Sequence, residues 1–184
     1  MTNKRSERTL RIVYAAMFAA MITVMTALIK IPSPTAGGYV HLGDTIVYLT
    51  SCILPLPYAL VACGIGGGLA DLLAGYPDVI IFTVIIKALN TLFFNSKEPK
   101  IFSKRNALMT IPSGFVTIIG YSISKFIRDL LLGTTIQVAF TDALLKMPEN
   151  AVQAFASAIA FILLAIALDK ANLKQNMLRS KIWK

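Results

Sequence analysis

The chain has 184 residues, of which 56% are hydrophobic and 15% are charged, and its formal net charge is +9. A soluble domain carries about 25% charged residues, so this composition, with a mean hydropathy of +0.69, excludes an ordinary soluble domain and indicates a membrane protein. The Lys and Arg residues gather in short hydrophilic segments (the N-terminus, residues 97–105 and the stretch after residue 168), which is typical of the cytoplasmic flanks of membrane spans and argues against a nucleic-acid-binding surface.

The first predicted span covers residues 10–29, and its inner half contains the sequence YAAMFAAM. Alanines in this segment repeat every fourth residue, a spacing that lets another helix approach closely. Packing within the chain explains such a stripe, and a docking surface for a separate membrane subunit explains it as well. The residues concerned are Ala15, Ala16, Ala19 and Ala20.

The apolar stretch 45–76 is too long for one crossing, because a straight helix of this length runs about 48 Å and the hydrocarbon core is about 30 Å thick. The N-terminus and the loop 97–105 are both basic, so both are expected on the cytoplasmic side, with an even number of spans between them. A break at the sequence LPLP (residues 54–57), where proline interrupts a helix, meets this requirement. The second span, 41–54, is then short, at about 21 Å.

The sequence therefore predicts an all-α integral membrane protein, folded as a single domain over residues 1–184, with six transmembrane helices and both termini cytoplasmic. A non-basic loop is expected over residues 133–147, ahead of an uncharged last span. Polar residues gather in the outer loops, so we expect the functional site on the outer side. The six predicted spans are 10–29, 41–54, 57–76, 79–94, 107–132 and 150–168.

Two charged residues fall deep within predicted spans, where a charge is costly and indicates a function. Asp71 lies near the outer end of the third span and Lys87 at the middle of the fourth. Asn90, three residues after Lys87, lies on the same helix face. All three are candidate substrate-binding residues. The alternative for Lys87 is a structural ion pair with Asp71 or Asp44.

The fifth span carries three charged residues in its outer half, Lys125, Arg128 and Asp129. Helical spacing would let Asp129 offset the charge of Lys125. The alternative is that the long cationic side chains reach the outer headgroups.

Polar residues next to the second and last spans are the remaining candidates for substrate binding. His41 and Asp44 open the second span, where Asp44 is either a ligand or the N-cap of the helix. Asn150 and Gln153 open the last span and present two amides on one face, which suits a polar heterocycle; Asn150 is alternatively an N-cap. Tyr39 offers an aromatic surface for stacking.

Several kinds of chemistry lack their usual residues in this sequence. The glycine-rich segment GIGGGLA has no Lys-Ser/Thr and so is not a phosphate-binding loop, and we expect no ATPase site. With one histidine in the chain, we expect neither a metal site nor catalytic residues. A stand-alone secondary transporter of a small polar solute is an alternative, although such proteins usually show internal repeats.

Taken together, the motifs of this chain resemble those of the S component of energy-coupling factor (ECF) vitamin transporters. The resemblance spans nearly the whole chain, and its most specific parts are YVHLGD and GLADLLAGYP. The other segments that carry it are the alanine stripe, IIKALN and PENAVQ.

This resemblance implies a substrate-binding subunit of the prokaryotic plasma membrane that works with a transmembrane coupling protein, the T component, and two cytoplasmic ATPase subunits. It implies that the alanine stripe faces the coupling protein and that the loop 32–39 covers the substrate. The substrate type is expected to be hydroxymethylpyrimidine or a pyridoxine-like compound, and alternatives are riboflavin or pantothenate. No cofactor is expected. The charged cluster in the fifth span departs from the pattern of the family.

Overall fold

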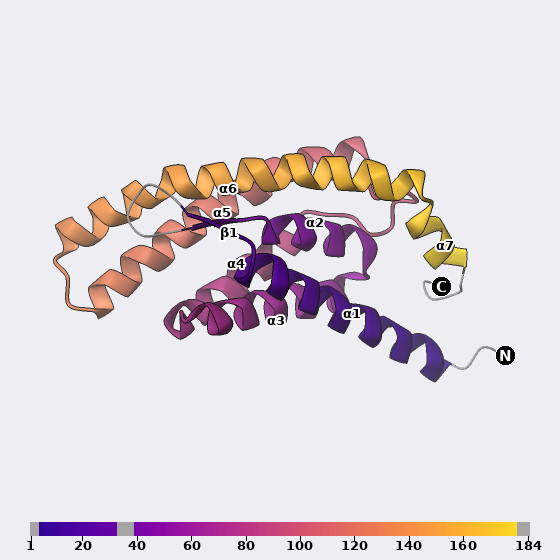
Figure 1. The fold of residues 1–184 in the computed structure, drawn as a ribbon, viewed down its shortest axis with the longest axis horizontal. Helices are drawn as coiled ribbons and strands as arrows, with labels where there is room; N and C mark the ends of the chain where they lie inside the picture. Colours follow the sequence, from indigo (N-terminus) through magenta and orange to yellow (C-terminus); the bar gives the residue numbers. More distant parts are fainter. Residues whose placement is uncertain (1–3, 33–38, 180–184) are drawn as a thin grey trace.

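The computed structural model describes residues 4–32 and 39–179, and these residues form helices joined by turns and loops and one small β-hairpin (Figure 1). The predicted helical fold is thereby confirmed. The elements in chain order are α1 (Lys4–Ala27), β1 (Lys30–Pro32), β2 (Tyr39–His41), α2 (Gly43–Ile53), α3 (Leu56–Ala74), the short helix η1 (Pro77–Val79), α4 (Ile80–Thr91), α5 (Lys104–Leu131), α6 (Ile136–Lys170) and α7 (Leu173–Arg179).

Among the described residues, four helices are long and apolar enough to cross a membrane: α1, α3, α5 and α6. Helices α2 and α4 have 11 and 12 residues, about 16 and 18 Å, which is short of the hydrocarbon core. The structure therefore supports a multi-pass membrane protein, and the count of six crossings stays a prediction.

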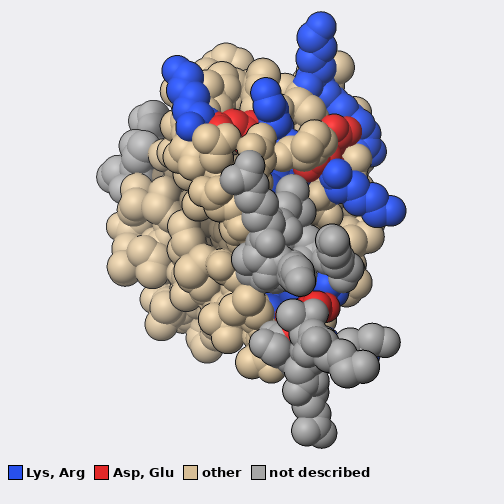
Figure 2. All heavy atoms as spheres, turned by 90° about the vertical axis from the view of Figure 1, so that its right-hand side faces the viewer, with Lys and Arg blue, Asp and Glu red and all other residues tan. Residues whose placement is uncertain are grey.

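The start of α1 and helix α7 lie at the same end of the molecule (Figure 1). Lys and Arg side chains gather on that end face, as Figure 2 shows. This arrangement agrees with the expected basic cytoplasmic surface. The cytoplasmic location of the termini stays a prediction.

The proposed break at residues 54–57 is present, since α2 ends at Ile53 and α3 begins at Leu56. Pro57 lies in the first turn of α3. Backbone N–H groups in a first turn have no acceptor within the helix, so proline costs no hydrogen bond there, and its fixed φ angle suits the helix. The chain thus reverses between α2 and α3 without a long loop.

The prediction of a loop over residues 133–147 is wrong, since most of this segment is helical. The chain turns at Gly133, whose φ is +85°, and α6 then runs for 35 residues from Ile136, with Pro148 inside it. Ala139 and Ala143 are buried along this part of the helix, which packs beside α5. The two N-cap alternatives are also wrong: Asn150 lies within α6, and the N-cap of α2 is Leu42 rather than Asp44.

The small hairpin between α1 and α2 was not predicted. Its strands β1 and β2 pair antiparallel, with Lys30 opposite His41 and Pro32 opposite Tyr39. Both strands lie in the segment that joins α1 to α2. Residues 33–38, within the loop expected to cover the substrate, lie outside the described residues.

Helix α1 packs closely against α3 through one side of the alanine stripe. The Thr23 hydroxyl donates a hydrogen bond to the Gly66 carbonyl oxygen at 3.0 Å, and a Cβ atom added to Gly66 would lie only 2.7 Å from the carbonyl oxygen of Ala19. Ala15 and Ala19 are buried. The face formed by Ala16 and Ala20, by contrast, is exposed.

We expect Gly66→Ala to destabilise the protein, because the added methyl group would push two helix backbones apart. Overpacking of this kind costs about 1–3 kcal/mol. The control is Gly64→Ala, whose Cβ would meet its nearest neighbour at an ordinary 3.4 Å and which gains helix propensity. Thermal unfolding of the purified variants in detergent measures both effects. Equal melting temperatures for the two variants would contradict the close α1–α3 contact.

Candidate functional site

A cavity of about 250 Å³ lies at the end of the bundle where α5 turns into α6, opposite to α7. Most of the residues in its wall are polar, and they include tyrosines and charged residues; the wall is contributed by β2, the end of α3, η1, α5 and α6. The lining residues are His41, Asp71, Tyr76, Val79, Tyr121, Ser124, Lys125, Arg128, Asp142, Lys146, Glu149, Asn150 and Gln153.

The spacing of the lining residues explains why two helices form most of the wall. On α5 they fall at positions 121, 124, 125 and 128, and on α6 at positions 142, 146, 149, 150 and 153. Intervals of three and four residues place side chains on one face of a helix. Each helix therefore presents a single polar stripe to the cavity.

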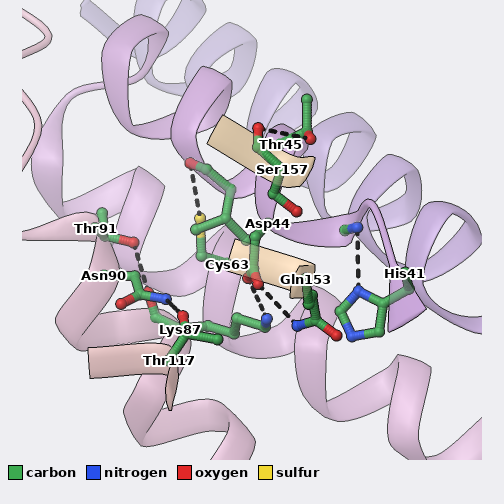
Figure 3. Close-up of polar contacts among 12 residues, drawn as sticks. His41, Asp44, Thr45, Cys63, Lys87, Asn90, Thr91, Thr117, Gln153 and Ser157 are labelled. Carbon is green, nitrogen blue, oxygen red and sulfur yellow. Dashed lines mark hydrogen bonds and ion pairs between the residues drawn. The ribbon is translucent and has the colours of Figure 1, made fainter. Parts of the chain in front are cut away.

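An ion pair lies beneath the cavity, between Lys87 of α4 and Asp44 in the first turn of α2 (Figure 3). Both side chains are fully buried. The second carboxylate oxygen of Asp44 accepts a hydrogen bond from Nε2 of Gln153 at 3.0 Å. The Lys87 ammonium also lies 5.3 Å from the centre of the Tyr121 ring. These contacts connect α2, α4, α5 and α6 at one point.

The structure places the predicted site residues in two layers. His41, Asp71, Asn150 and Gln153 line the cavity. Asp44, Lys87 and Asn90 lie below it and are fully buried, so their direct contact with a substrate stays a prediction. Of the two partners considered for Lys87, the structure shows Asp44. The side chain of Tyr39 lies outside the described residues.

Asn90 belongs to the lower layer through a hydrogen bond to α5. Its Nδ2 donates to the hydroxyl oxygen of Thr117 at 2.9 Å. A buried amide bonded in this way holds α4 against α5.

The sequence analysis missed several residues of the wall, most clearly Tyr121, Ser124, Asp142 and Lys146. The last two fall in the segment that was taken for a loop, so their helical spacing to Glu149 was not considered. The signal that would have found them is the repeat of polar residues at intervals of three and four over positions 142–153.

The cationic groups of the wall are each paired with a carboxylate. The ammonium nitrogen of Lys125 lies 2.5 Å from a carboxylate oxygen of Asp129 and 3.4 Å from one of Asp142. The first of these contacts confirms the predicted Lys125–Asp129 pair. Arg128 pairs with Asp78, and the ammonium of Lys146 lies 2.7 Å from Glu149. The wall therefore carries charges of both signs close together, and Lys125 is one of the residues that line the cavity.

Three buried residues of the wall each retain a polar atom that has no hydrogen-bond partner among the described residues. They are the Oδ2 atom of Asp71, the Oε2 atom of Glu149 and the Nδ2 atom of Asn150. Buried polar atoms in folded proteins nearly always have a partner. Two acceptors and one donor thus remain to be matched at this site.

His41 is a neutral group at this site. Its Nδ1 accepts a hydrogen bond from the backbone N–H of Gly43 at 3.2 Å, so the proton of the neutral ring is on Nε2. The Nδ1 atom of a charged imidazolium carries a proton and cannot accept a hydrogen bond, so this contact requires the uncharged ring.

Comparison with known proteins gives agreement on family and fold. The family described as "ECF-type riboflavin transporter, S component" matches residues 6–170. A protein of Pyrococcus woesei, described as an uncharacterised protein in a gap 3′ region, is 33% identical over 102 residues, which is 54% of this chain and 68% of that protein. The S component of a bacterial ECF transporter has a similar structure, with a TM-score of 0.69, 21% identity, and coverage of 89% of this chain and 97% of its own.

We expect Asp44→Asn and Lys87→Met each to destabilise the protein, because either change leaves one buried charge without its partner. Breaking a buried ion pair costs about 3–5 kcal/mol. The double variant Asp44→Asn/Lys87→Met has no unpaired charge, so it should be more stable than either single variant. Thermal unfolding in detergent checks this order. Additive losses in the double variant would contradict the pairing.

Proposed function

Because this chain belongs to the family of ECF-type riboflavin transporter S components, we propose that it is the substrate-binding subunit of an ATP-driven vitamin uptake transporter. Its substrate is a small nitrogen heterocycle, a vitamin or vitamin precursor, that binds in the cavity between α5 and α6. The protein works in a prokaryotic plasma membrane and captures the substrate from the outer side.

The observation that carries this proposal is the set of unmatched polar atoms in the cavity wall. The carboxylate oxygens of Asp71 and Glu149 call for N–H or O–H groups on the substrate, and the Asn150 amide nitrogen calls for an acceptor. Tyr76 and Tyr121 supply aromatic surface beside them. Hydroxymethylpyrimidine and pyridoxine carry hydroxyl groups and ring nitrogens that meet this pattern.

Riboflavin is the second candidate, and the family description favours it. Its ring system offers an imide N–H between two carbonyl groups, and its side chain offers several hydroxyl groups. These groups would also satisfy two acceptors and one donor. Riboflavin is much larger than the pyrimidine, so direct binding measurements separate the two.

The energy for transport comes, in this proposal, from a T component and two ATPase subunits. The exposed face of α1 that contains Ala16 and Ala20 is the proposed contact with the T component, because small residues there permit close helix approach. Ala15 and Ala19 support this surface from behind by packing α1 on α3.

Binding of hydroxymethylpyrimidine, pyridoxine and riboflavin to the purified protein, measured by calorimetry, tests the substrate. Mass spectrometry of compounds that co-elute with the protein is an independent readout. We expect Asp71→Ala, Glu149→Ala and Asn150→Ala each to weaken binding about 10-fold, since each removes one buried hydrogen bond of about 1–2 kcal/mol.

The control for these measurements is Glu7→Gln, which removes a carboxylate from α1 outside the cavity wall. It should leave binding unchanged. If none of the three compounds binds, the proposed substrate class is wrong. If a compound binds and the three cavity variants all keep the wild-type affinity, the proposed site is wrong.

We expect Ala16→Trp/Ala20→Trp to prevent co-purification with co-expressed T component and ATPases while leaving substrate binding intact. Two indole rings would block close approach of a partner helix. Val61→Trp, at an exposed position on α3, is the matched control and should retain the complex. Complex formation by the alanine double variant at the level of this control would exclude α1 as the contact.

A further inference from the structure

We propose that the Asp44–Lys87 ion pair sets the orientation of the Gln153 amide, and that Gln153 therefore acts as a hydrogen-bond acceptor toward the substrate. The inference rests on the proposed function, because it concerns which heterocycles the same cavity selects. Asp44 and Lys87 are then positioning residues, and Gln153 is a specificity-determining residue.

The first step is the chemistry of the contact between Gln153 and Asp44. An amide side chain has one end that donates hydrogen bonds and one that accepts them, whereas an ionised carboxylate only accepts. The Nε2 atom of Gln153 donates to Oδ2 of Asp44 at 3.0 Å. The other oxygen of the carboxylate, Oδ1, is occupied by the Lys87 ammonium.

The second step is that the amide cannot turn over without a large cost. A rotated Gln153 would place its oxygen against Oδ2 of Asp44, so that two acceptors would face each other in a fully buried site. That arrangement loses a charge-assisted hydrogen bond and leaves both oxygens unmatched in a region of low dielectric constant. Lys87 enforces this choice because its charge is what allows an ionised Asp44 to remain buried.

The third step is the position of the amide oxygen of Gln153 when the amide nitrogen is bonded to Asp44. Gln153 lines the cavity, and in Figure 3 its oxygen lies on the side away from Asp44, toward His41. The unmatched carboxylate oxygens of Asp71 and Glu149 belong to the same wall. The wall residues Asp71, Glu149 and Gln153, from α3 and α6, therefore each carry an acceptor oxygen.

The consequence is that the cavity prefers substrates with a hydrogen-bond donor opposite Gln153. The type of vitamin alone does not imply this preference. A substrate edge that meets Gln153 must carry an N–H or O–H group. An amino-substituted pyrimidine or the imide N–H of a flavin fulfils this condition. An analogue with a carbonyl oxygen or a methylated nitrogen at that edge would face Gln153 with no hydrogen to donate, and one buried acceptor would stay unsatisfied.

Two pairs of probes differ at this edge alone. They are 4-amino-5-hydroxymethyl-2-methylpyrimidine with its 4-dimethylamino counterpart, and riboflavin with 3-methylriboflavin. For the pair whose parent compound binds, we expect wild-type protein to bind the donor-bearing member at least about 10-fold more tightly, which corresponds to one buried hydrogen bond.

The decisive variant is Asp44→Asn/Lys87→Met. This double variant removes both charges. The amide side chain at position 44 has a donor end and an acceptor end, and either can bond to Gln153. The Gln153 amide can therefore adopt either orientation. We expect the ratio of the two affinities to fall to within about threefold. The variant Gln153→Leu should bind both probes more weakly and without preference. The control Glu7→Gln should keep the wild-type ratio. A ratio of affinities is informative here because a general loss of structural stability lowers both affinities together.

The outcomes distinguish the proposed function from the inference about Gln153. If neither parent compound binds to wild-type protein, the proposed substrate class fails and this inference falls with it. If a parent compound binds but the ratio is unchanged in the double variant, the proposed function stands and the inference is wrong. Should the double variant not fold, an unchanged ratio in Gln153→Leu overturns the inference by itself.

Discussion

The arrangement of this protein depends on a pair of opposite charges buried where neither could exist alone. An isolated charge inside a membrane costs several kcal/mol or more, and the Asp44–Lys87 pair avoids this cost only while α2 and α4 stay in register. Gln153 and Tyr121 complete the surroundings of the pair from α6 and α5. The charges thus hold four helices in one relative position, directly below the cavity.

This central role explains how α2 can be both short and wholly buried. All 11 of its residues are buried, so it needs no apolar length to match the lipid. Its first turn carries Asp44 beneath the cavity, and near its last turn the carbonyl oxygen of Cys52 accepts a hydrogen bond from the buried ammonium of Lys174 in α7 at 2.7 Å. One short helix therefore connects the surroundings of the cavity with the C-terminal helix at the opposite end.

Several of these features could be predicted from the sequence, because the residue types that are costly to bury and those that break helices can be read from short segments. The deep Lys87, the break ahead of Pro57 and the Lys125–Asp129 pair all follow from residue type and spacing. The choice of Asp44 rather than Asp71 as the partner of Lys87 depends on how α2 packs, which no local pattern contains. The prediction for residues 133–147 failed for a different reason: the segment was taken as a non-basic connection ahead of the last span, although Asp142, Lys146 and Glu149 repeat with the helical period and line a cavity.

The two layers of the site separate what holds the fold from what selects the ligand. A relative with 21% identity shares this fold, and a fold of this kind does not by itself specify a substrate. Residues of the upper layer, such as Ser124 and Asp142, lie on polar helix faces and can change without leaving a charge unpaired in the core. The lower layer cannot change in this way, since altering Asp44 or Lys87 alone breaks the ion pair. Gln153 belongs to both layers, because it lines the cavity and bonds to Asp44. It is the residue through which a fixed element of the core imposes a hydrogen-bonding requirement on whatever the cavity binds.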